Sequence, residues 1–283
     1  MRDRYRSGKP SQTAAWPAKT AACGVALAVM TLAAACGTSV PPGSASAAVP
    51  PGPVAPVTVS SARAARLPRA TTFTTLRGVP QDPDPFATGS GLVTHPAVTQ
   101  MVYARPGGPP VAALPATELG NPTWVPVVQA QPGWERVLLP SRPDRSTGWI
   151  YSGGSGLQTA YTAYQVNIEL TARKLTVYDS GRSLGSWSVA IGGPSTPTPT
   201  GRTFLLASLS PARPTYSPLI LPLGTHSATL STFGGGPGTV ALHGWPDTTV
   251  FGRAVSHGCV RVPATALQVL SRIPLGSPVM ITR

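Results

Sequence analysis

The sequence has few charged residues, few aromatic residues and only three cysteines. Charged residues make up 11% of the 283 positions, and aromatic residues make up 6%. Coiled coils and long helical bundles need many regularly spaced charged side chains, so this composition argues against both. Proline (34) and glycine (30) are abundant and unevenly distributed. The composition therefore predicts a mainly β protein whose modules are joined by linkers.

The net charge is +13, but beyond the first twenty positions the basic residues are scattered arginines and one lysine, Lys174. The sequence has no lysine-rich run and no basic stretch interleaved with aromatic residues, which nucleic-acid-binding surfaces usually have. We therefore expect no nucleic-acid partner. The positive charge could serve to attract the protein to an anionic cell wall or membrane surface. The alternative is that it only keeps the protein soluble.

Residues 1–36 have the pattern of a secretory signal peptide. Residues 1–19 are polar and basic, and residues 21–35 form an uncharged apolar run that is too short for the roughly twenty residues of a membrane span. The run ends at Ala33-Ala34-Ala35-Cys36, which resembles the lipidation signal of bacterial lipoproteins. This resemblance implies export and a lipid anchor on Cys36 at the outer face of the cytoplasmic membrane. A plain cleaved signal with Cys36 unmodified is the alternative.

Residues 37–93 contain mostly proline, alanine, serine, glycine and valine. Few of these side chains are large and apolar, so the segment itself buries too little surface to offset the entropy of ordering. We predict a disordered linker over 37–93, which would carry a folded domain from the membrane toward the cell wall.

Residues 94–153 contain five short apolar runs separated by turn residues, which predicts a small β-barrel. The stretches Gly-Trp-Glu-Arg-Val (133–137) and Thr-Gly-Trp-Ile (147–150) resemble SH3-like modules of bacterial cell-wall enzymes. Its aromatic residues line a ligand groove or form the core, and in so small a barrel the core is the favoured interpretation. They are Tyr103, Trp124, Trp134 and Trp149.

Residues 161–283 have the pattern of a second, larger β domain. Apolar and polar residues alternate from Tyr164, and a strand over 239–242 would place His243 at its end. The stretch 263–272 has helical periodicity with proline in the first turn.

Cys259 is the strongest candidate for a reactive group. It is the only cysteine outside the predicted signal, and His243 and His257 both precede it within seventeen positions. A thiol attacks carbonyl carbon as the thiolate, and a neighbouring imidazole can remove the proton. A buried structural cysteine is the alternative. A zinc site from these three residues fits by ligand type, but no further cysteine or histidine pair accompanies it, so we expect no metal.

The stretch Ser256-His257-Gly258-Cys259-Val260-Arg261, preceded by His243-Gly244, resembles the signature of L,D-transpeptidase (YkuD-like) catalytic domains. The resemblance runs from about Tyr164 to Arg283 and implies a β-sandwich with a short helix. It also implies that the Gly244 carbonyl orients the base. We expect Cys259 as nucleophile and His243 as its base. Ser256, His257 and Gly258 would support the site, with the amides of residues 257–259 as oxyanion donors. His257 would be a structural hydrogen-bonder more than a second base. Arg261 would hold a substrate carboxylate or support its loop.

The resemblance implies a peptidoglycan L,D-transpeptidase that forms cross-links through a cysteine thioester. The donor would be a tetrapeptide stem, the acceptor an amine of a neighbouring stem, and carbapenem-type β-lactams would acylate the thiol. The resemblance implies no cofactor. A cysteine L,D-carboxypeptidase and a non-enzymatic cell-wall-binding lipoprotein are the alternatives.

Overall fold

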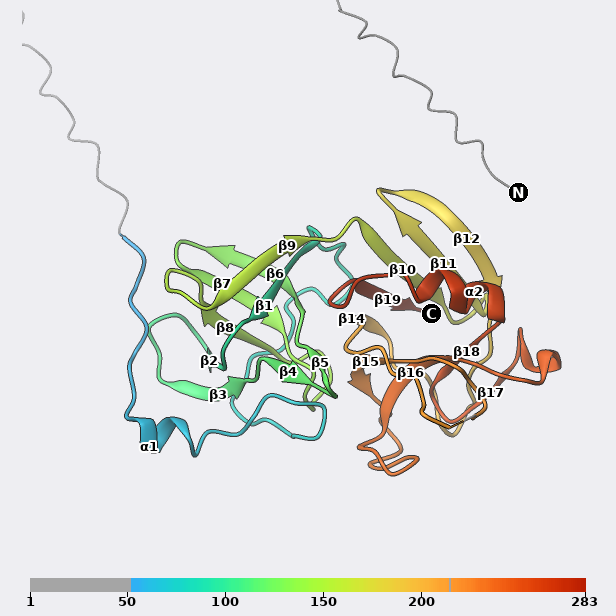
Figure 1. Ribbon diagram of the computed structural model, residues 1–283, viewed down its shortest axis with the longest axis horizontal. Helices are drawn as coiled ribbons and strands as arrows, with labels where there is room; N and C mark the ends of the chain where they lie inside the picture. The colour runs from blue at the N-terminus through green and yellow to red at the C-terminus, as the bar shows by residue number, and fades with distance from the viewer. Residues whose placement is uncertain (1–51, 214) are drawn as a thin grey trace, which may run out of the picture. The chain divides into compact units, whose positions relative to one another are not determined.

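The computed structural model describes residues 52–213 and 215–283, and strands dominate it (Figure 1). This confirms the predicted mainly β class. The predicted signal peptide, Cys36 and residues 37–51 of the predicted linker lie outside the described residues. Across the described part of the chain, no helix has the length and apolar character required to pass through a membrane.

The N-terminal module, residues 92–161, is a seven-stranded antiparallel sheet (green in Figure 1). We expected five strands over 94–153; the sheet extends past both ends of that range because its first and last strands pair with each other. In spatial order the strands are β3 (Pro110–Leu114), β2 (Gln100–Tyr103), β8 (Thr147–Tyr151), β7 (Trp134–Leu138), β6 (Val125–Gln131), β1 (Leu92–Pro96) and β9 (Leu157–Tyr161). A small pair, β4 (Thr117–Glu118) and β5 (Asn121–Pro122), lies between β3 and β6 in the chain. The likeness to SH3-like modules stays a prediction.

Three of the four aromatic residues expected in the core of this module are buried: Tyr103, Trp134 and Trp149. Trp124 is only half-buried and lies against the ring of His95, with ring centroids 5.1 Å apart. Aromatic rings in a sheet this small therefore serve mainly as core, as expected.

The prediction of a disordered linker is wrong for residues 52–93. Ala70, Thr72 and Leu76 are almost fully buried, and Asp82 forms a bidentate ion pair with Arg202 at 2.6 and 2.7 Å. The segment contains the short helix α1 (Ser61–Ala64) and three strand-like contacts with the module, at residues 69, 75 and 81. Its own apolar content is low, but hydrogen bonds and an ion pair to residues far along the chain stabilise it.

The start of this segment packs on the aromatic core of the module. Trp134 Nε1 donates to the carbonyl oxygen of Val54 at 2.8 Å, and the Tyr103 hydroxyl donates to that of Val57 at 3.3 Å. The indole and phenol are buried polar groups that need partners, and the proline-rich backbone supplies them.

The C-terminal region, residues 164–283, has two main sheets packed face to face, as the predicted β-sandwich requires (yellow to red in Figure 1). The larger sheet has the order β12 (Arg182–Ser188), β11 (Lys174–Asp179), β10 (Tyr164–Glu169), β19 (Pro278–Thr282) and β14 (Gly201–Phe204). The smaller sheet has the order β15 (Ile220–His226), β16 (Thr239–Gly244) and β18 (Val260–Val262). A short pair, β13 (Ile191–Gly192) and β17 (Ala254–Ser256), lies beside them.

Alternating residues of these strands form the core between the two sheets. Val166 and Ile168 of β10 are fully buried, as the alternation predicted, and they belong to one cluster with Leu242 and Val260 of the smaller sheet. Helix α2 (Ala264–Leu270) covers the core with Leu267 and Leu270, and the short 3-10 helix η1 (Thr248–Val250) follows β16.

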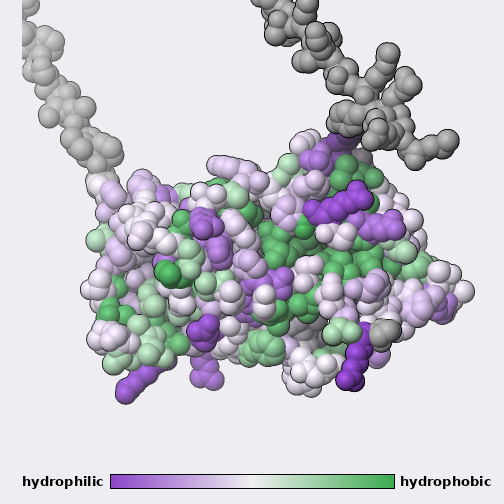
Figure 2. Space-filling view, viewed as in Figure 1, coloured by the Kyte–Doolittle hydropathy of each residue, from purple (hydrophilic) through white to green (hydrophobic). Residues whose placement is uncertain are grey.

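The two regions share a second core cluster. Phe204 and Leu206 of the C-terminal region are fully buried among residues of the N-terminal module such as Val102 and Ile150. The predicted domains over 94–153 and 161–283 are therefore parts of one compact unit. On the face shown in Figure 2, strongly hydrophilic residues form separate small groups, as the scattered charges of the sequence lead one to expect.

Candidate active site

Parallel pairing of β16 with β18 brings the two sequence motifs together. His243 and Arg261 are register partners, and Leu242 pairs with Val260. Cys259 comes directly before β18, and the backbone of Ala241 in β16 donates a hydrogen bond to its thiol. The strand predicted to end at His243 is present, and its end lies beside the cysteine.

The two residues line one cavity of about 200 Å³. His243 is 5% exposed, and Cys259 is half-buried. The cavity is lined by Tyr216, Phe233, His243, Trp245, Ser256, His257, Cys259 and Arg261. Sequence analysis missed Tyr216, Phe233 and Trp245, which lie in segments without a recognisable motif.

The imidazole of His243 is oriented by its own backbone neighbour. Nδ1 lies 2.8 Å from the carbonyl oxygen of Gly244, which only accepts hydrogen bonds, so Nδ1 carries a proton. In the neutral ring, Nε2 is then free to accept a proton. The Gly244 N–H donates to Ser217 Oγ at 2.8 Å, and Ser217 Oγ donates to the Leu219 carbonyl at 2.6 Å. Ser217 is thus a support that the sequence did not reveal.

The loop that carries Cys259 is fixed by short hydrogen bonds. Ser256 Oγ donates to the Cys259 carbonyl at 2.5 Å and accepts the Gly258 N–H at 3.2 Å. Thr198 Oγ1 donates to the Gly258 carbonyl at 2.8 Å. Gly258 has φ +117°, a conformation that other residues rarely adopt. The Gly258 N–H is bonded to Ser256 in this structure, and its expected role as an oxyanion donor stays a prediction.

His257 differs from its predicted role. Its ring is exposed and lies against Phe233, with centroids 5.3 Å apart, and no hydrogen bond to this ring occurs within residues 52–213 and 215–283. We expected a structural hydrogen-bonder. The structure instead shows a side chain that packs on the cavity wall.

In comparisons with known proteins, the matching part of the chain is the part that contains the His243-Gly244 and Ser256–Arg261 motifs. Residues 163–281 match the family model YkuD, described as an L,D-transpeptidase catalytic domain. Residues 163–281 are therefore similar to this family. YkuD of Bacillus licheniformis is 29% identical over 153 residues, which cover 52% of this chain and 86% of that protein.

Two solved structures resemble the chain more distantly. L,D-transpeptidase 3 of Mycobacterium tuberculosis, in complex with a faropenem-derived adduct, has a TM-score of 0.41 and 13% identity, covering 67% of this chain and 95% of that chain. The L,D-transpeptidase LdtMt1, in complex with imipenem, has a TM-score of 0.39 and 18% identity, covering 68% of this chain and 82% of that chain.

Burial favours the neutral form of both Cys259 and His243. Burial lowers the pKa of His243, and the nearby Arg261 lowers it further, although the bond to Gly244 opposes both effects. Burial raises the pKa of Cys259, against smaller opposing effects of the Ala241 hydrogen bond and Arg261. At neutral pH the pair is therefore thiol and imidazole, in contrast to a thiolate–imidazolium pair.

This protonation state predicts how the Cys259 thiol reacts with iodoacetamide as the pH changes. Because the pKa is raised, Cys259 carries less thiolate than a free cysteine at any pH between 7 and 9, so alkylation should be slower than that of N-acetylcysteine and should still rise above pH 9. Mass spectrometry of the intact protein gives the rates. A rate at pH 7 above that of N-acetylcysteine would instead indicate a thiolate–imidazolium pair.

Arg261 presents a positive charge to the cavity that Cys259 and His243 line. Its guanidinium carbon lies 3.6 Å from the centre of the Trp245 ring, a cation–π contact that fixes the side chain. Its Nε is buried without a hydrogen-bond partner among the described residues. A buried donor without a partner suits an incoming acceptor such as a carboxylate.

The described residues contain no group of three or more histidine, cysteine, aspartate or glutamate side chains arranged to hold a metal ion. The cavity holds the thiol of Cys259 and the oriented imidazole of His243. Such a pair can act as a nucleophile with its base.

Proposed function

We propose that the chain is a peptidoglycan L,D-transpeptidase that joins stem peptides through a thioester on Cys259. One observation carries the proposal: Cys259 and His243 line the same cavity on paired strands, with His243 Nδ1 held by the Gly244 carbonyl. The match of residues 163–281 to the YkuD family model supports peptidoglycan stem peptides as the substrate class.

In the first half-reaction, His243 Nε2 takes the thiol proton as Sγ attacks the carbonyl carbon between the diamino acid and the terminal D-alanine of the donor stem. The tetrahedral intermediate collapses when the C–N bond breaks. The imidazolium returns the proton to the leaving amine, so D-alanine departs neutral at nitrogen and a thioester remains. The amides of residues 257 and 259 would face the oxyanion, since that of Gly258 is bonded to Ser256.

In the second half-reaction, an amine of the acceptor stem attacks the thioester. His243 takes a proton from the attacking nitrogen and gives it to the departing sulfur, so an amide forms and the thiol is restored. Tyr216, Phe233 and Trp245 give the cavity an aromatic wall against which the acceptor stem would lie.

Purified protein incubated with a disaccharide tetrapeptide tests the proposal by mass spectrometry of the products. A cross-linked dimer with loss of D-alanine is the expected product. Tripeptide alone would identify the carboxypeptidase, in which water replaces the acceptor amine. An unchanged substrate would leave a non-enzymatic wall-binding protein.

We assign Arg261 to the donor carboxylate. Arg261→Lys should lower kcat/KM for cross-linking about ten- to a hundredfold, mainly through KM, because a lysine loses both the bidentate geometry and the stacking on Trp245. Steady-state kinetics on the tetrapeptide measures the loss. Arg253→Lys, an exposed arginine in the loop before β17, is the matched control. Equal kinetics of both variants would remove Arg261 from substrate binding.

β-Lactams are proposed as acylating inhibitors, since a thiol with an adjacent base opens a strained amide by the same first step. A faropenem-derived adduct is described for L,D-transpeptidase 3 of M. tuberculosis. Meropenem should add its mass to the peptide that contains Cys259, and a mass on any other residue would contradict the assignment.

The proposed function requires that the protein act outside the cytoplasmic membrane, and we propose the lipid anchor on Cys36 as the means. Fractionation of cells that express Cys36→Ser tests the anchor. Release of the variant into the soluble fraction supports it, and retention in membranes opposes it.

A further inference from the structure

A loop of the C-terminal region forms part of the cavity wall. The 227–238 loop joins β15 to β16, and its Phe233 lines the cavity and lies against His257. Its first residue, Ser227, lies close to Gly258: a methyl group at Gly258 would be 3.9 Å from the Ser227 Cβ. The position of this loop therefore decides the shape of the space beside Cys259.

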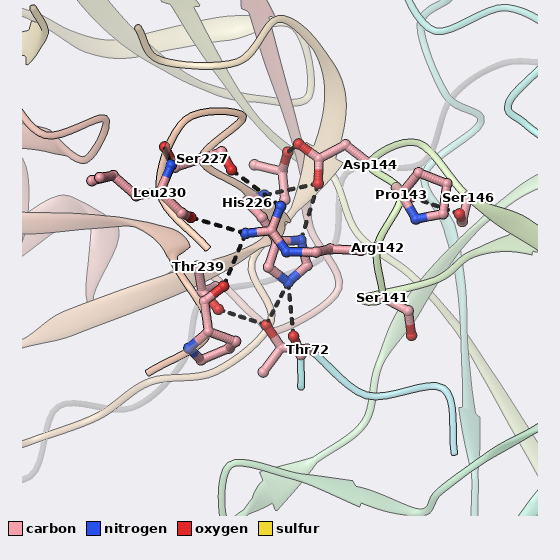
Figure 3. A network of polar contacts seen from close by, with 12 residues as sticks. Thr72, Ser141, Arg142, Pro143, Asp144, Ser146, His226, Ser227, Leu230 and Thr239 are labelled. Atoms are coloured by element: carbon pink, nitrogen blue, oxygen red, sulfur yellow. Dashed lines mark hydrogen bonds and ion pairs between the residues drawn. The ribbon is translucent and has the colours of Figure 1, made fainter. Parts of the chain in front are cut away.

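One arginine of the N-terminal module holds this loop (Figure 3). Arg142 lies in the turn between β7 and β8, and its guanidinium donates to three carbonyl oxygens of the loop. These belong to Ser227 at 3.1 Å, Leu230 at 3.1 Å and Pro237 at 3.0 Å. They come from the beginning, the middle and the end of the loop. A planar guanidinium with five donors can join all three, whereas an ammonium group presents a single point charge.

The same turn is fixed to the adjacent strand by Asp144. Its carboxylate accepts the His226 N–H at 2.9 Å and the Thr225 hydroxyl at 2.7 Å, and it lies 3.0 Å from Nδ1 of His226. His226 is completely buried, and its Nε2 lies 2.9 Å from the carbonyl oxygen of Thr72. The end of β15, where the loop begins, is thus fixed from two sides (Figure 3).

Residues 71–76 hold the turn from behind. The N–H of Arg142 donates to the Thr74 carbonyl at 3.0 Å, the N–H of Leu76 donates to the Arg142 carbonyl at 2.8 Å, and Ser141 Oγ donates to the Thr71 carbonyl at 3.0 Å. The backbone of Arg142 is therefore ordered independently of the loop, so its side chain meets the three carbonyls with little further loss of entropy.

We propose that Arg142 is a positioning residue of the active site, which holds the 227–238 loop against the Cys259 loop. The N-terminal module is then part of the catalytic unit and not only a spacer between membrane and enzyme. Arg142 contacts neither substrate nor reacting atoms; it acts through the backbone of Ser227 and the placement of Phe233. The effect on activity rests on the proposed function, but the effect on the loop does not.

The test compares Arg142→Gln and Arg142→Lys in the full chain with Arg145→Gln, an exposed arginine of the same turn. Hydrogen exchange followed by mass spectrometry reports on the loop. Its amides should exchange at least about tenfold faster in Arg142→Gln, to a smaller degree in Arg142→Lys, and at the native rate in Arg145→Gln. In Arg142→Gln, kcat/KM for cross-linking should fall on the order of ten- to a hundredfold, because small displacements of a cavity wall misplace the substrate. Alkylation of Cys259 by iodoacetamide, a small reagent, should stay within about twofold.

Native exchange of the loop in Arg142→Gln would overturn the proposal, and so would unchanged cross-linking kinetics in a variant whose loop exchanges faster. If Arg142→Gln does not fold, Arg142→Lys decides by the same two measurements. If the native protein lacks transpeptidase activity, the proposed function is wrong, but the exchange measurement still tests whether Arg142 holds the 227–238 loop.

Discussion

Cys259→Ala and Cys259→Ser are both expected to lose acyl transfer by at least about 10⁴-fold, because the proposed acyl-enzyme forms on this thiol, while the Ser256 hydroxyl in the same cavity is bonded to the Cys259 carbonyl. Alanine removes the attacking atom. Serine retains a smaller, far less acidic nucleophile, and burial lowers the pKa of His243, which makes it a weaker base toward a hydroxyl.

Mass spectrometry of the cross-linked product and of a meropenem adduct measures this loss. Both variants should fold, because Cys259 is half-buried and either replacement fits its space; circular dichroism and thermal unfolding provide the control. Cross-linking by folded Cys259→Ala at a tenth of the native rate or more would remove the thiol from the mechanism.

His243→Asn is expected to lower kcat by about 10²- to 10⁴-fold, the usual contribution of a general base. The amide of asparagine can still donate to the Gly244 carbonyl, so the local structure should persist, but it cannot accept the thiol proton. In the native enzyme the rate should fall as the pH drops through the lowered pKa of His243, since the imidazolium cannot act as a base. In the variant this fall should be absent.

His257→Asn separates the two imidazoles of the cavity. Because the His257 ring is exposed and lies against Phe233, its loss should reduce kcat far less than the loss of His243. The same pH–rate measurement compares them. If His257→Asn abolished the acid limb of the profile while His243→Asn kept it, the roles of the two residues would be exchanged.

The parts of the fold that the sequence predicted are those set by local patterns. Alternation at Val166 and Ile168 identified β10 as a strand with one buried face. The turn Asp179-Ser180-Gly181 is a local pattern of the same kind, and it joins the next two strands, β11 and β12. Ser180 and Gly181 both have positive φ, as such a turn requires. His243 at a strand end, and Cys259 after a glycine, were likewise visible in short motifs.

The parts that the sequence did not predict depend on contacts between distant residues. Ser217 supports Gly244 from a segment with no regular pattern, and Trp245 is recognisable as a partner only once Arg261 is seen above its ring. The composition of residues 52–93 predicted disorder because it counts only the segment's own apolar side chains. Asp82 finds its partner at Arg202, and no local pattern carries that information.

The raised pKa of the half-buried Cys259 thiol also affects its oxidation between turnovers. Peroxides and disulfides react with thiolates and hardly with thiols, so a cysteine whose pKa is raised by burial is oxidised slowly. The export proposed for this protein would expose it to such oxidants without the reducing systems of the cytoplasm. Slow oxidation of the Cys259 thiol in the empty site would then keep the protein active for longer.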